Sequence, residues 1–392
     1  MSETVSLNII PGIAAVERAA WDGCAAGAAL QDPQREERFN PFTCHDFLHA
    51  LEVSGSVGPG TGWTAAHVLA KSADGVLTGV APAYLKTHSM GEYVFDHAWA
   101  EALERAGGRY YPKVLSGVPF MPVTGPRLLA KSAAGRSVLV QGLEALRRAG
   151  KASSVHVNFI GDADRTALAQ AGFLARQGQQ FHFQNPGYGD FATYLGALAA
   201  RKRKMVRHER ESALAAGIEV HCLTGSDLKP EHWDAFFEFY MDTGARKWGR
   251  PYLTRSFFEA VGASMAPHIL LVMARRHGRW IAGALNFIGA DALYGRNWGA
   301  IEHHPFLHFE LCYYQAIEFA LTRGLKRVEA GAQGEHKLAR GYGPVATHSA
   351  HHFDDPRMMA ALRDYLARES ELVEADIELY EAHMPFRHDQ PA

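Results

Sequence analysis

The segment at residues 329–344, EAGAQGEHKLARGYGP, concentrates side chains that can do chemistry. Its glycines let the backbone approach a ligand or take a positive φ, and it follows a predicted strand, whose carboxyl end is where open α/β sheets place ligands. We expect His336 to accept a proton near neutral pH, and Lys337 and Arg340 to hold a phosphate or carboxylate. The other expected substrate contacts in this segment are Glu329, Gln333 and Tyr342. The alternative is a glycine-rich turn with solvated charges.

A second candidate proton acceptor, Glu310, lies on a helix predicted over residues 305–322, which is apolar nearly all round and therefore typical of a buried helix. At spacings of three and four, Glu310 meets Tyr313 and Tyr314, and a lone buried carboxylate is costly and has a raised pKa. Glu310 is therefore either a structural carboxylate paired with a tyrosine hydroxyl or an arginine, or a poised proton acceptor. His308 lies on the polar side of the helix and is a candidate substrate contact.

Metal and phosphate-loop signatures are missing from the sequence. The paired histidines at 303–308 and 348–352 do not form an HExxH helix and have no compact acidic partners, so we expect no metal site. There is no GxxxxGK loop, and the pyrophosphate pattern of acetyl-CoA enzymes occurs at residues 147–152 only at a helix end before a strand. Residues 340–345 fit that pattern until their last position, a valine. We therefore expect no tightly bound cofactor, and an acyl donor that acts as a co-substrate.

The elements that would position these residues occur twice along the chain. The first half predicts a hairpin, a helix, a strand, a short helix and a strand, at residues 66–85, 137–148, 154–160, 164–171 and 180–184. The second half repeats much of this order, with strands at residues 269–274, 280–288 and 292–298, a helix at 305–322 and a strand at 327–330. This repetition predicts a duplicated α/β lobe with a mixed, strongly twisted sheet in each copy. We place the lobes at residues 1–188 and 189–392.

Two further helices are expected outside the repeat. A helix predicted over residues 190–216 contains the only dense basic run, from Arg201 to Arg210. This run is either the contact for a phosphate-rich partner, such as tRNA or a nucleotide-linked acceptor, or a solvated helix face. The helix predicted over residues 356–384 has one apolar stripe and should pack as an outer helix.

Composition narrows the class of protein. The 392 residues are 47% hydrophobic and 21% charged, which is ordinary for a globular chain, and the net charge of −2 gives no global attraction to nucleic acid or an acidic membrane. No signal peptide is evident at the first residues, and no apolar run approaches the ~18 residues of a membrane helix. The four cysteines contain no CxxC pair, which fits a reducing compartment. We therefore expect a cytoplasmic protein without membrane insertion.

Several longer segments resemble the FemAB-like family of predicted N-acyltransferases, which is assigned to peptidoglycan biosynthesis or recognition and is related to the Fem peptidyltransferases. These segments are YYPK at residues 110–113, VPFMPVTGPR at 118–127, LHFELCYY at 307–314 and residues 329–341. The resemblance extends from about residue 40 to about residue 352. It implies two tandem acyltransferase-like (GNAT) lobes. Fem enzymes move an amino acid from aminoacyl-tRNA to a lipid- or nucleotide-linked cell-wall peptide, but the long coiled-coil arm of that group is not evident here.

Together these observations predict an N-acyltransferase or aminoacyltransferase. Its donor would be aminoacyl-tRNA or an acyl-CoA, and its acceptor a small-molecule or peptide amine. We expect the site in a cleft of the C-terminal lobe, with Tyr111, Lys113 and Arg127 completing the acceptor pocket from the other lobe. The alternatives are a non-catalytic recognition module for peptidoglycan precursors and a conventional acetyl-CoA-dependent N-acetyltransferase, and fold alone does not separate them. The sequence predicts no oligomeric state.

Overall fold

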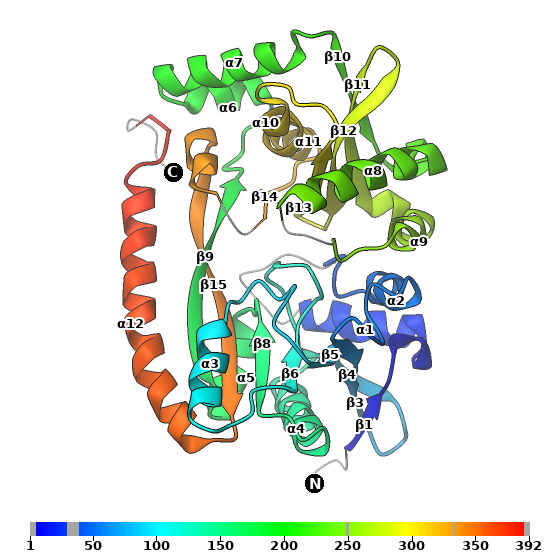
Figure 1. Cartoon of the computed structure of the whole chain (residues 1–392), viewed down its shortest axis with the longest axis vertical. Helices are drawn as coiled ribbons and strands as arrows, with labels where there is room; N and C mark the ends of the chain where they lie inside the picture. The colour runs from blue at the N-terminus through cyan, green and yellow to red at the C-terminus, as the bar shows by residue number, and fades with distance from the viewer. Residues whose placement is uncertain (1–4, 30–38, 248–250, 332–333, 388–392) are drawn as a thin grey trace. The chain divides into compact units, whose positions relative to one another are not determined.

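The computed structural model describes residues 5–29, 39–247, 251–331 and 334–387 (Figure 1). The chain forms two compact units, of which unit 1 comprises Met1–Gly178 and Ala346–Glu374, and unit 2 comprises Gln179–Val345 and Ala375–Ala392. Three elements run through both units: β9 (Leu174–Gln184), β15 (Tyr342–Phe353) and α12 (Pro356–Glu381). The lobe boundary expected from the sequence lies between residues 188 and 189. The two units differ from that expectation mainly in residues 346–374, which belong to unit 1. These residues join unit 1 because β15 pairs with a unit 1 strand from Ser349 to Phe353.

Unit 1 contains two sheets. Its helices are α1 (Arg18–Ala29), α2 (His45–Val53), α3 (His97–Arg105), α4 (Ala133–Ala149) and α5 (Asp162–Gln170). Its strands are β1 (Ser6–Ile10), β2 (Trp63–Ala65), β3 (His67–Lys71), β4 (Leu77–Ala81), β5 (Ala83–Lys86), β6 (Lys113–Ser116), β7 (Leu129–Ala130) and β8 (Ser154–Asn158). One sheet has the order β1-β3-β4-β7 and is antiparallel. The other runs β15-β8-β6-β5-β2 and is mixed, because β6 and β8 are parallel.

Helix α4 organises the core of unit 1. Its N-cap, Ser132, accepts a hydrogen bond from the Gly135 amide at 3.0 Å, which satisfies one of the free N–H groups of the first turn. Its apolar stripe buries Leu139 and Leu143 completely, against strand residues that include Val68 and Val155. Burial of such side chains contributes about 1.5–3 kcal/mol each.

The strands of unit 2 follow the order β10-β11-β12-β13-β14-β9 within a mixed 11-stranded sheet whose remaining strands are β15-β8-β6-β5-β2. The unit 2 strands are β10 (Ile218–Leu223), β11 (Ile269–Arg276), β12 (Arg279–Ile288), β13 (Ala292–Ala300) and β14 (Arg327–Glu329), and among them only the β13–β14 pair is parallel. The helices are α6 (Phe191–Ala197), α7 (Ala200–Leu214), α8 (Pro230–Lys247), α9 (Arg255–Met265), α10 (Leu307–Phe309) and α11 (Gln315–Thr322). The predicted hairpin turn is confirmed: His277 and Gly278 have φ values of 50° and 77°, as a tight two-residue turn requires.

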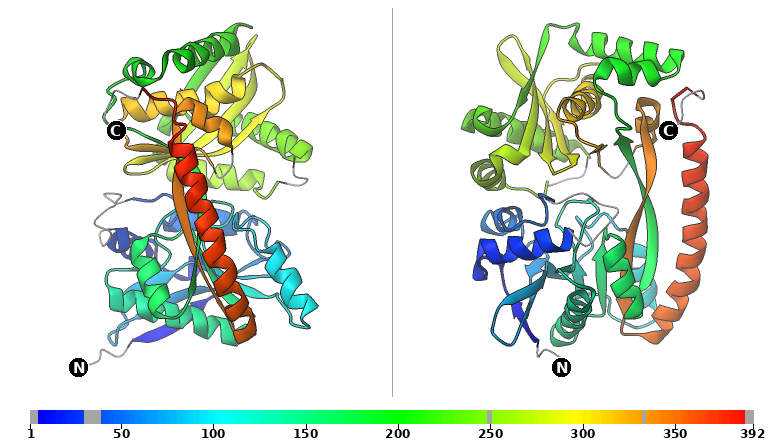
Figure 2. Two further views of the ribbon diagram at one scale, coloured as in Figure 1. Left: turned by 90° about the vertical axis from the view of Figure 1, so that its left-hand side faces the viewer. Right: turned by 180° about the vertical axis from the view of Figure 1, so that it is seen from behind.

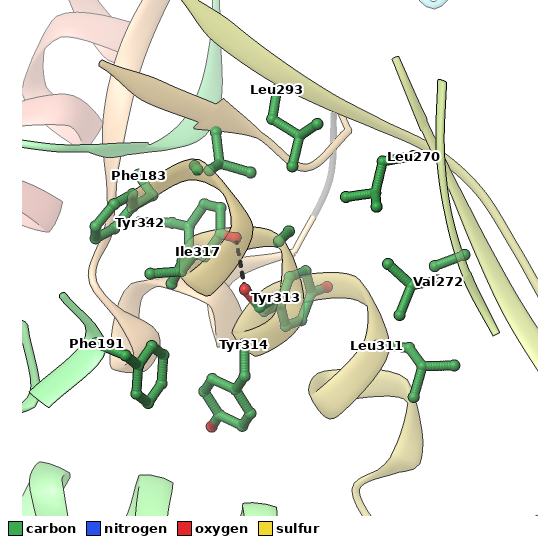
Figure 3. Close-up of a cluster of buried hydrophobic side chains, with 14 of the residues drawn as sticks. Phe183, Phe191, Leu270, Val272, Leu293, Leu311, Tyr313, Tyr314, Ile317 and Tyr342 are labelled. Carbon is green, nitrogen blue, oxygen red and sulfur yellow. Dashed lines mark hydrogen bonds between the residues drawn. The ribbon is translucent and has the colours of Figure 1, made fainter. Parts of the chain in front are cut away.

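The two faces of the unit 2 sheet are covered by different helices. A Cβ at Gly299 of β13 would meet Phe239 of α8, whereas the preceding residue, Trp298, faces the opposite side and contacts His308 of α10. Figure 2 shows α8 and α11 on opposite sides of these strands. The α11 side holds one hydrophobic core cluster, in which Leu270, Val272 and Leu293 pack with Leu311 and Ile317 (Figure 3).

Two predicted helices differ from the structure in their continuity. The helix predicted over residues 305–322 is buried as expected, but it consists of α10, a π-helical turn (Glu310–Tyr314) and α11. The prediction of one helix over residues 190–216 is wrong, because Leu198 and Ala199 take extended ψ angles of 147° and 145° between α6 and α7. The Ala199 amide donates to Pro385 O at 2.9 Å, so a long-range bond replaces the helical one. None of the helices that the structure describes is both long and apolar enough to cross a membrane.

Candidate active site

A cavity of about 100 Å³ lies in unit 2, on the α11 side of the sheet. It is lined by residues of β12 and β13, by the α10–π-turn segment and by the residue that follows β14: Ala284, Leu285, Asn286, Gly295, Arg296, Asn297, Trp298, His308, Cys312, Tyr313 and Ala330. The strands β13 and β14 pair from Ala292↔Arg327 to Tyr294↔Glu329, where β14 ends while β13 continues. The cavity therefore lies at the carboxyl end of β14, where an α/β sheet commonly binds ligands.

A bulge in β13 shapes this cavity. Leu285 of β12 faces Asn297, whereas its neighbour Asn286 faces Gly295, so Arg296 is an extra residue in β13. Bulges bend a strand and re-aim its side chains, and they are common beside active sites. A Cβ at Gly295 would lie 3.2 Å from Asn286 Oδ1 and 3.5 Å from Glu329 O. Glycine therefore keeps this wall of the cavity clear.

The π-helical turn carries Glu310, Cys312 and Tyr313, and such turns frequently occur at functional sites. The expected burial of Glu310 is confirmed, since its exposed fraction is 0%. Its carboxylate accepts hydrogen bonds from Arg210 at 2.9–3.2 Å and from Gln315 Nε2 at 2.8 Å. Arg210 also pairs with Glu318 at 2.8 Å. Glu310 therefore has the geometry of a structural carboxylate in an ion pair.

Tyr313 and His336 form a hydrogen-bonded pair at the cavity. The Tyr313 hydroxyl lies 2.8 Å from His336 Nε2, and the exposed imidazole stacks on Phe309 with ring centroids 5.7 Å apart. Partial burial and the charges of Arg340 and Lys337 lower the pKa of His336, and burial raises the pKa of Tyr313. Near pH 7 the imidazole is therefore neutral and the phenol protonated. In these states Tyr313 donates to His336 and a proton can pass along the pair.

Lys337 is buried near Arg296 and Cys312 of the cavity wall and donates a hydrogen bond to Gly331 O at 2.8 Å. Burial, reinforced by the positive charge of Arg296, lowers the pKa of Lys337 to about 7. Both the ammonium and the neutral amine are therefore populated near neutral pH. A lysine with this pKa at a cavity is typical of functional sites.

Arg340, the second expected anion contact, is used inside the protein. Its guanidinium donates to Glu209 at 2.7 and 3.1 Å and to His336 O at 2.6 Å, and it stacks over Phe309 at 3.6 Å. Glu209 is a buried residue of α7 and also accepts a hydrogen bond from Tyr314. This ion pair joins α7 to the turn that carries His336, and the Arg210–Glu310 pair joins α7 to the π-helical turn.

The other predicted contacts of unit 2 lie in different surroundings. His308 lines the cavity, with its ring centroid 5.1 Å from Trp298 and 5.4 Å from Tyr313. Glu329 is buried and accepts from Arg327 Nε at 3.0 Å. Tyr342 is also buried and donates to Tyr313 O at 3.4 Å (Figure 3). Gln333 lies outside the described residues.

The predicted acceptor contacts Tyr111, Lys113 and Arg127 belong to unit 1. The Lys113 ammonium is fully buried and donates to Ser89, Glu92 and Asp96, while the Tyr111 hydroxyl pairs with Ser89 at 2.8 Å. The Arg127 side chain, exposed by only 1%, donates to Asn158 O at 3.0 Å and to Val123 O at 2.5 Å. Within unit 1 these two cations stabilise neighbouring chain segments, and their role as substrate contacts stays a prediction.

Sequence reasoning missed most of the cavity. Asn286, Arg296 and Trp298 were not recognised, and Tyr313 was considered only as a neighbour of Glu310. A usable signal was Asn286, a lone amide inside the apolar strand β12. Among the residues that the structure describes, no three or more His, Cys, Asp or Glu side chains group as metal ligands would.

Comparisons with known proteins agree on the fold. By structure the chain is similar to FemX, with 12% sequence identity and a TM-score of 0.54, over 89% of this chain and 98% of FemX. It is also similar to L-PGS from Bacillus licheniformis, with 9% identity and a TM-score of 0.52, over 86% of this chain and 97% of L-PGS. A third similar structure is the C-terminal domain of a putative lysylphosphatidylglycerol synthetase from Agrobacterium fabrum. It has 10% identity and a TM-score of 0.51, over 89% of this chain and 96% of that domain. No curated protein matches it by sequence.

The expected α/β fold class, with mixed sheets flanked by helices, is confirmed. The FemAB-like family model, described as peptidoglycan biosynthesis/recognition, matches residues 12–388, which is nearly the whole chain. The expectation drawn from the motifs at residues 110–127 and 307–341 is thereby confirmed. The chain belongs to the FemAB-like family.

Proposed function

We propose that this protein transfers an acyl or aminoacyl group from an activated ester or thioester, an aminoacyl-tRNA or an acyl-CoA, to a primary amine. The reaction would take place at the unit 2 cavity. The observation that carries the proposal is the Tyr313–His336 pair, in which the hydroxyl of a cavity-lining tyrosine bonds to an exposed neutral imidazole. The family description, peptidoglycan biosynthesis/recognition, supports a cell-wall-related acceptor.

The pair supplies the proton transfer that the reaction needs. The amine nitrogen attacks the carbonyl carbon, a C–N bond forms, and the carbonyl π electrons move to oxygen. The positively charged nitrogen loses a proton to the Tyr313 hydroxyl as that hydroxyl gives its own proton to His336 Nε2. When the oxyanion collapses, the C–O or C–S bond breaks and the leaving group takes the proton from His336. General acid–base catalysis of this kind contributes about 10²–10⁴-fold in rate.

Lys337 would stabilise the oxyanion. A cation held in a buried, water-poor position interacts strongly with charge that develops beside it. The ammonium of Lys337 is already fixed by Gly331 O at 2.8 Å, so little reorganisation is required. Negative charge on the substrate oxygen also stabilises the protonated form of Lys337. Lys337 therefore holds its proton more tightly in the transition state than in the free enzyme.

These assignments predict a narrow bell-shaped pH profile of kcat/KM. His336 must be neutral, and its pKa lies below the ordinary value of 6.5, so the rate should rise with pH on the acid side. Lys337 must be charged, so the rate should fall as pH rises through about 7. Lys337→Arg keeps the cation charged, and its alkaline limb should move up by at least about two pH units, since arginine stays protonated. An alkaline limb that is unchanged in Lys337→Arg would show that another group titrates there.

The donor is identified by incubating the full chain with labelled acetyl-CoA or with bulk tRNA charged with labelled amino acids. A nucleotide-linked peptidoglycan precursor and free lysine serve as amine acceptors. Transfer from either donor supports the proposal and chooses between the two donor classes. Binding of the precursor without transfer from either donor would instead favour the recognition module.

If tRNA is the donor, helix α7 should contribute to its binding. Arg201, Lys204 and Arg207 are exposed on α7, while Glu209 and Arg210 of the same helix pair with Arg340 and Glu310 at the site. Each neutralised phosphate adds about 0.7–0.9 to the slope of log affinity against log salt. Charge reversal of the three exposed cations should reduce this slope and weaken tRNA binding in a filter assay. Reversal of Arg105, Arg109 and Lys151, exposed in unit 1, is the matched control, and equal loss in both variants would contradict a role for α7.

A further inference from the structure

Helix α12 (Pro356–Glu381) has two apolar stripes in the structure, whereas the sequence predicted one. The first stripe faces the protein: Met358, Leu362 and Leu366 are buried, and Val373 and Ile377 are half-buried. The second stripe is exposed, and Figure 2 (left) shows α12 with no other described helix or strand in front of it. We call this second stripe the α12 seam, and it consists of Ala361, Tyr365, Arg368, Leu372, Ala375 and Leu379.

The α12 seam has the spacing of a helix that pairs with another helix. Its residues follow one another at alternating steps of four and three, which keeps them on one side of the helix in the heptad pattern of paired helices. Tyr365, Leu372 and Leu379 are exposed by 44%, 69% and 55%. Apolar side chains scattered singly over a surface need no explanation, but a continuous row of them along a helix is typical of an interaction site.

Acidic side chains border the seam on both sides. Helical spacing places Glu369 and Asp376 on the side next to the protein, and Asp364, Glu371 and Glu378 on the outer side. Glu369 is paired within the protein, since it accepts hydrogen bonds from Arg176 of β9 at 2.7 and 2.8 Å. The other four acids are exposed and form no ion pair with any residue that the structure describes. They are therefore available to a partner.

These charges decide what can cover the seam. A second copy of α12, parallel or antiparallel, would bring its own acidic flanks against those of the first, and like charges in contact oppose pairing. An anionic lipid surface would be repelled for the same reason. A helix with lysine or arginine on its flanks would instead form ion pairs, as Arg176 already does with Glu369.

We propose that the α12 seam binds an amphipathic helix of a partner protein, one with leucine or similar apolar residues at heptad spacing and lysine or arginine on both flanks. Binding would remove the Leu372 and Leu379 side chains from water, which drives association, while the flanking charges select the partner. The proposal does not depend on the transfer reaction, because none of the seam residues lines the unit 2 cavity.

The first test uses a synthetic helix as the probe. It is a labelled peptide of three heptads with leucine and alanine at the seam positions and lysine at the flanks, and the matched probe has glutamate at the flanks. Fluorescence anisotropy with the full chain at pH 7.5 should show saturable binding of the lysine peptide, at least about tenfold tighter than the glutamate peptide, because ion pairs replace repulsions. This affinity should fall severalfold between about 0.05 M and about 0.5 M NaCl, as the Debye length shortens. Equal affinities, or no saturable binding of the lysine peptide, would refute the proposal.

Variants of α12 locate the binding. Leu372→Ser/Leu379→Ser should weaken binding of the lysine peptide by at least about tenfold, because both leucines lose apolar contact area in the complex. Glu371→Lys/Glu378→Lys reverses the charge of the outer flank, so it should weaken binding of the lysine peptide and strengthen that of the glutamate peptide. Val53→Ser changes a valine of unit 1 that is exposed by 64% and should alter neither. Circular dichroism melts report folding, and unchanged binding by a folded Leu372→Ser/Leu379→Ser variant overturns the site.

Two other occupants of the seam are distinct outcomes. Sedimentation velocity of the chain alone at pH 7.5 should show no dimer that the Leu372→Ser/Leu379→Ser variant abolishes, and such a dimer would assign the seam to a second copy. Cosedimentation with phosphatidylcholine vesicles that the same variant abolishes would assign the seam to a neutral lipid surface. Either result would overturn the proposal of a basic partner helix.

Discussion

Replacement of His336 by alanine should lower the rate of transfer by about 10²–10⁴-fold, because the variant lacks the group that accepts the amine proton from Tyr313. The imidazole is exposed and makes a hydrogen bond to Tyr313 and a stacking contact with Phe309. Its loss should therefore cost about 1 kcal/mol or less of unfolding free energy. Turnover with the donor identified above and a urea melt on the same preparation measure the two quantities.

Two further variants make this result specific. Tyr313→Phe keeps the ring in the cavity wall but removes the hydroxyl, so it should lose activity to a similar extent if the proton passes through the phenol. His97→Ala changes an exposed histidine of unit 1 and should leave transfer unaffected. Full activity in His336→Ala would refute its role as proton acceptor. A strongly lowered melting temperature would show instead that His336 is a structural residue.

The strands β11, β12 and β13 were predictable because their signals are local. Apolar alternation and the His277–Gly278 turn define the β11–β12 hairpin within the continuous segment 269–288. The break between α6 and α7 has no such signal, because it depends on a hydrogen bond from Ala199 to Pro385, far along the chain. The same holds for β15, whose pairing with β8 moves residues 346–374 into unit 1.

The candidate site shows the same limit. Helical spacing correctly predicted that Glu310 is buried, but its partner Arg210 lies 100 residues earlier and is brought there by α7. The π-helical turn also changes the phase of the helix, so that Gln315, five residues on, donates to Glu310. Helical spacings of three and four do not reveal that contact.

Lys337 and Arg340, two cations three residues apart, could not be told apart from the sequence, but they have different surroundings in the structure. Both lie on one short turn, Glu335–Arg340, yet Arg340 pairs with Glu209 while Lys337 donates only to a backbone carbonyl among the bonds that the structure describes. The difference arises because Glu209 of α7 places its carboxylate beside Arg340. Tertiary contacts therefore decide which cation remains available for substrate charge.

Replacement of Arg210 by methionine should destabilise the protein by about 3–5 kcal/mol, because it leaves the carboxylate of Glu310 buried without its guanidinium partner. Urea unfolding of the variant and of the wild type measures this difference.

The double variant Arg210→Met/Glu310→Gln tests the same ion pair from both sides. It removes both charges, so it should recover most of the lost stability, since a neutral pair avoids the cost of an unpaired ion. Arg275→Met is the matched control: its ion pair with Glu219 is largely exposed, so the change should cost about 1 kcal/mol or less. If the double variant folds and transfers at the wild-type rate, Glu310 has a structural role and His336 carries the proton. If it folds but is inactive while His336→Ala is active, the proton acceptor is Glu310.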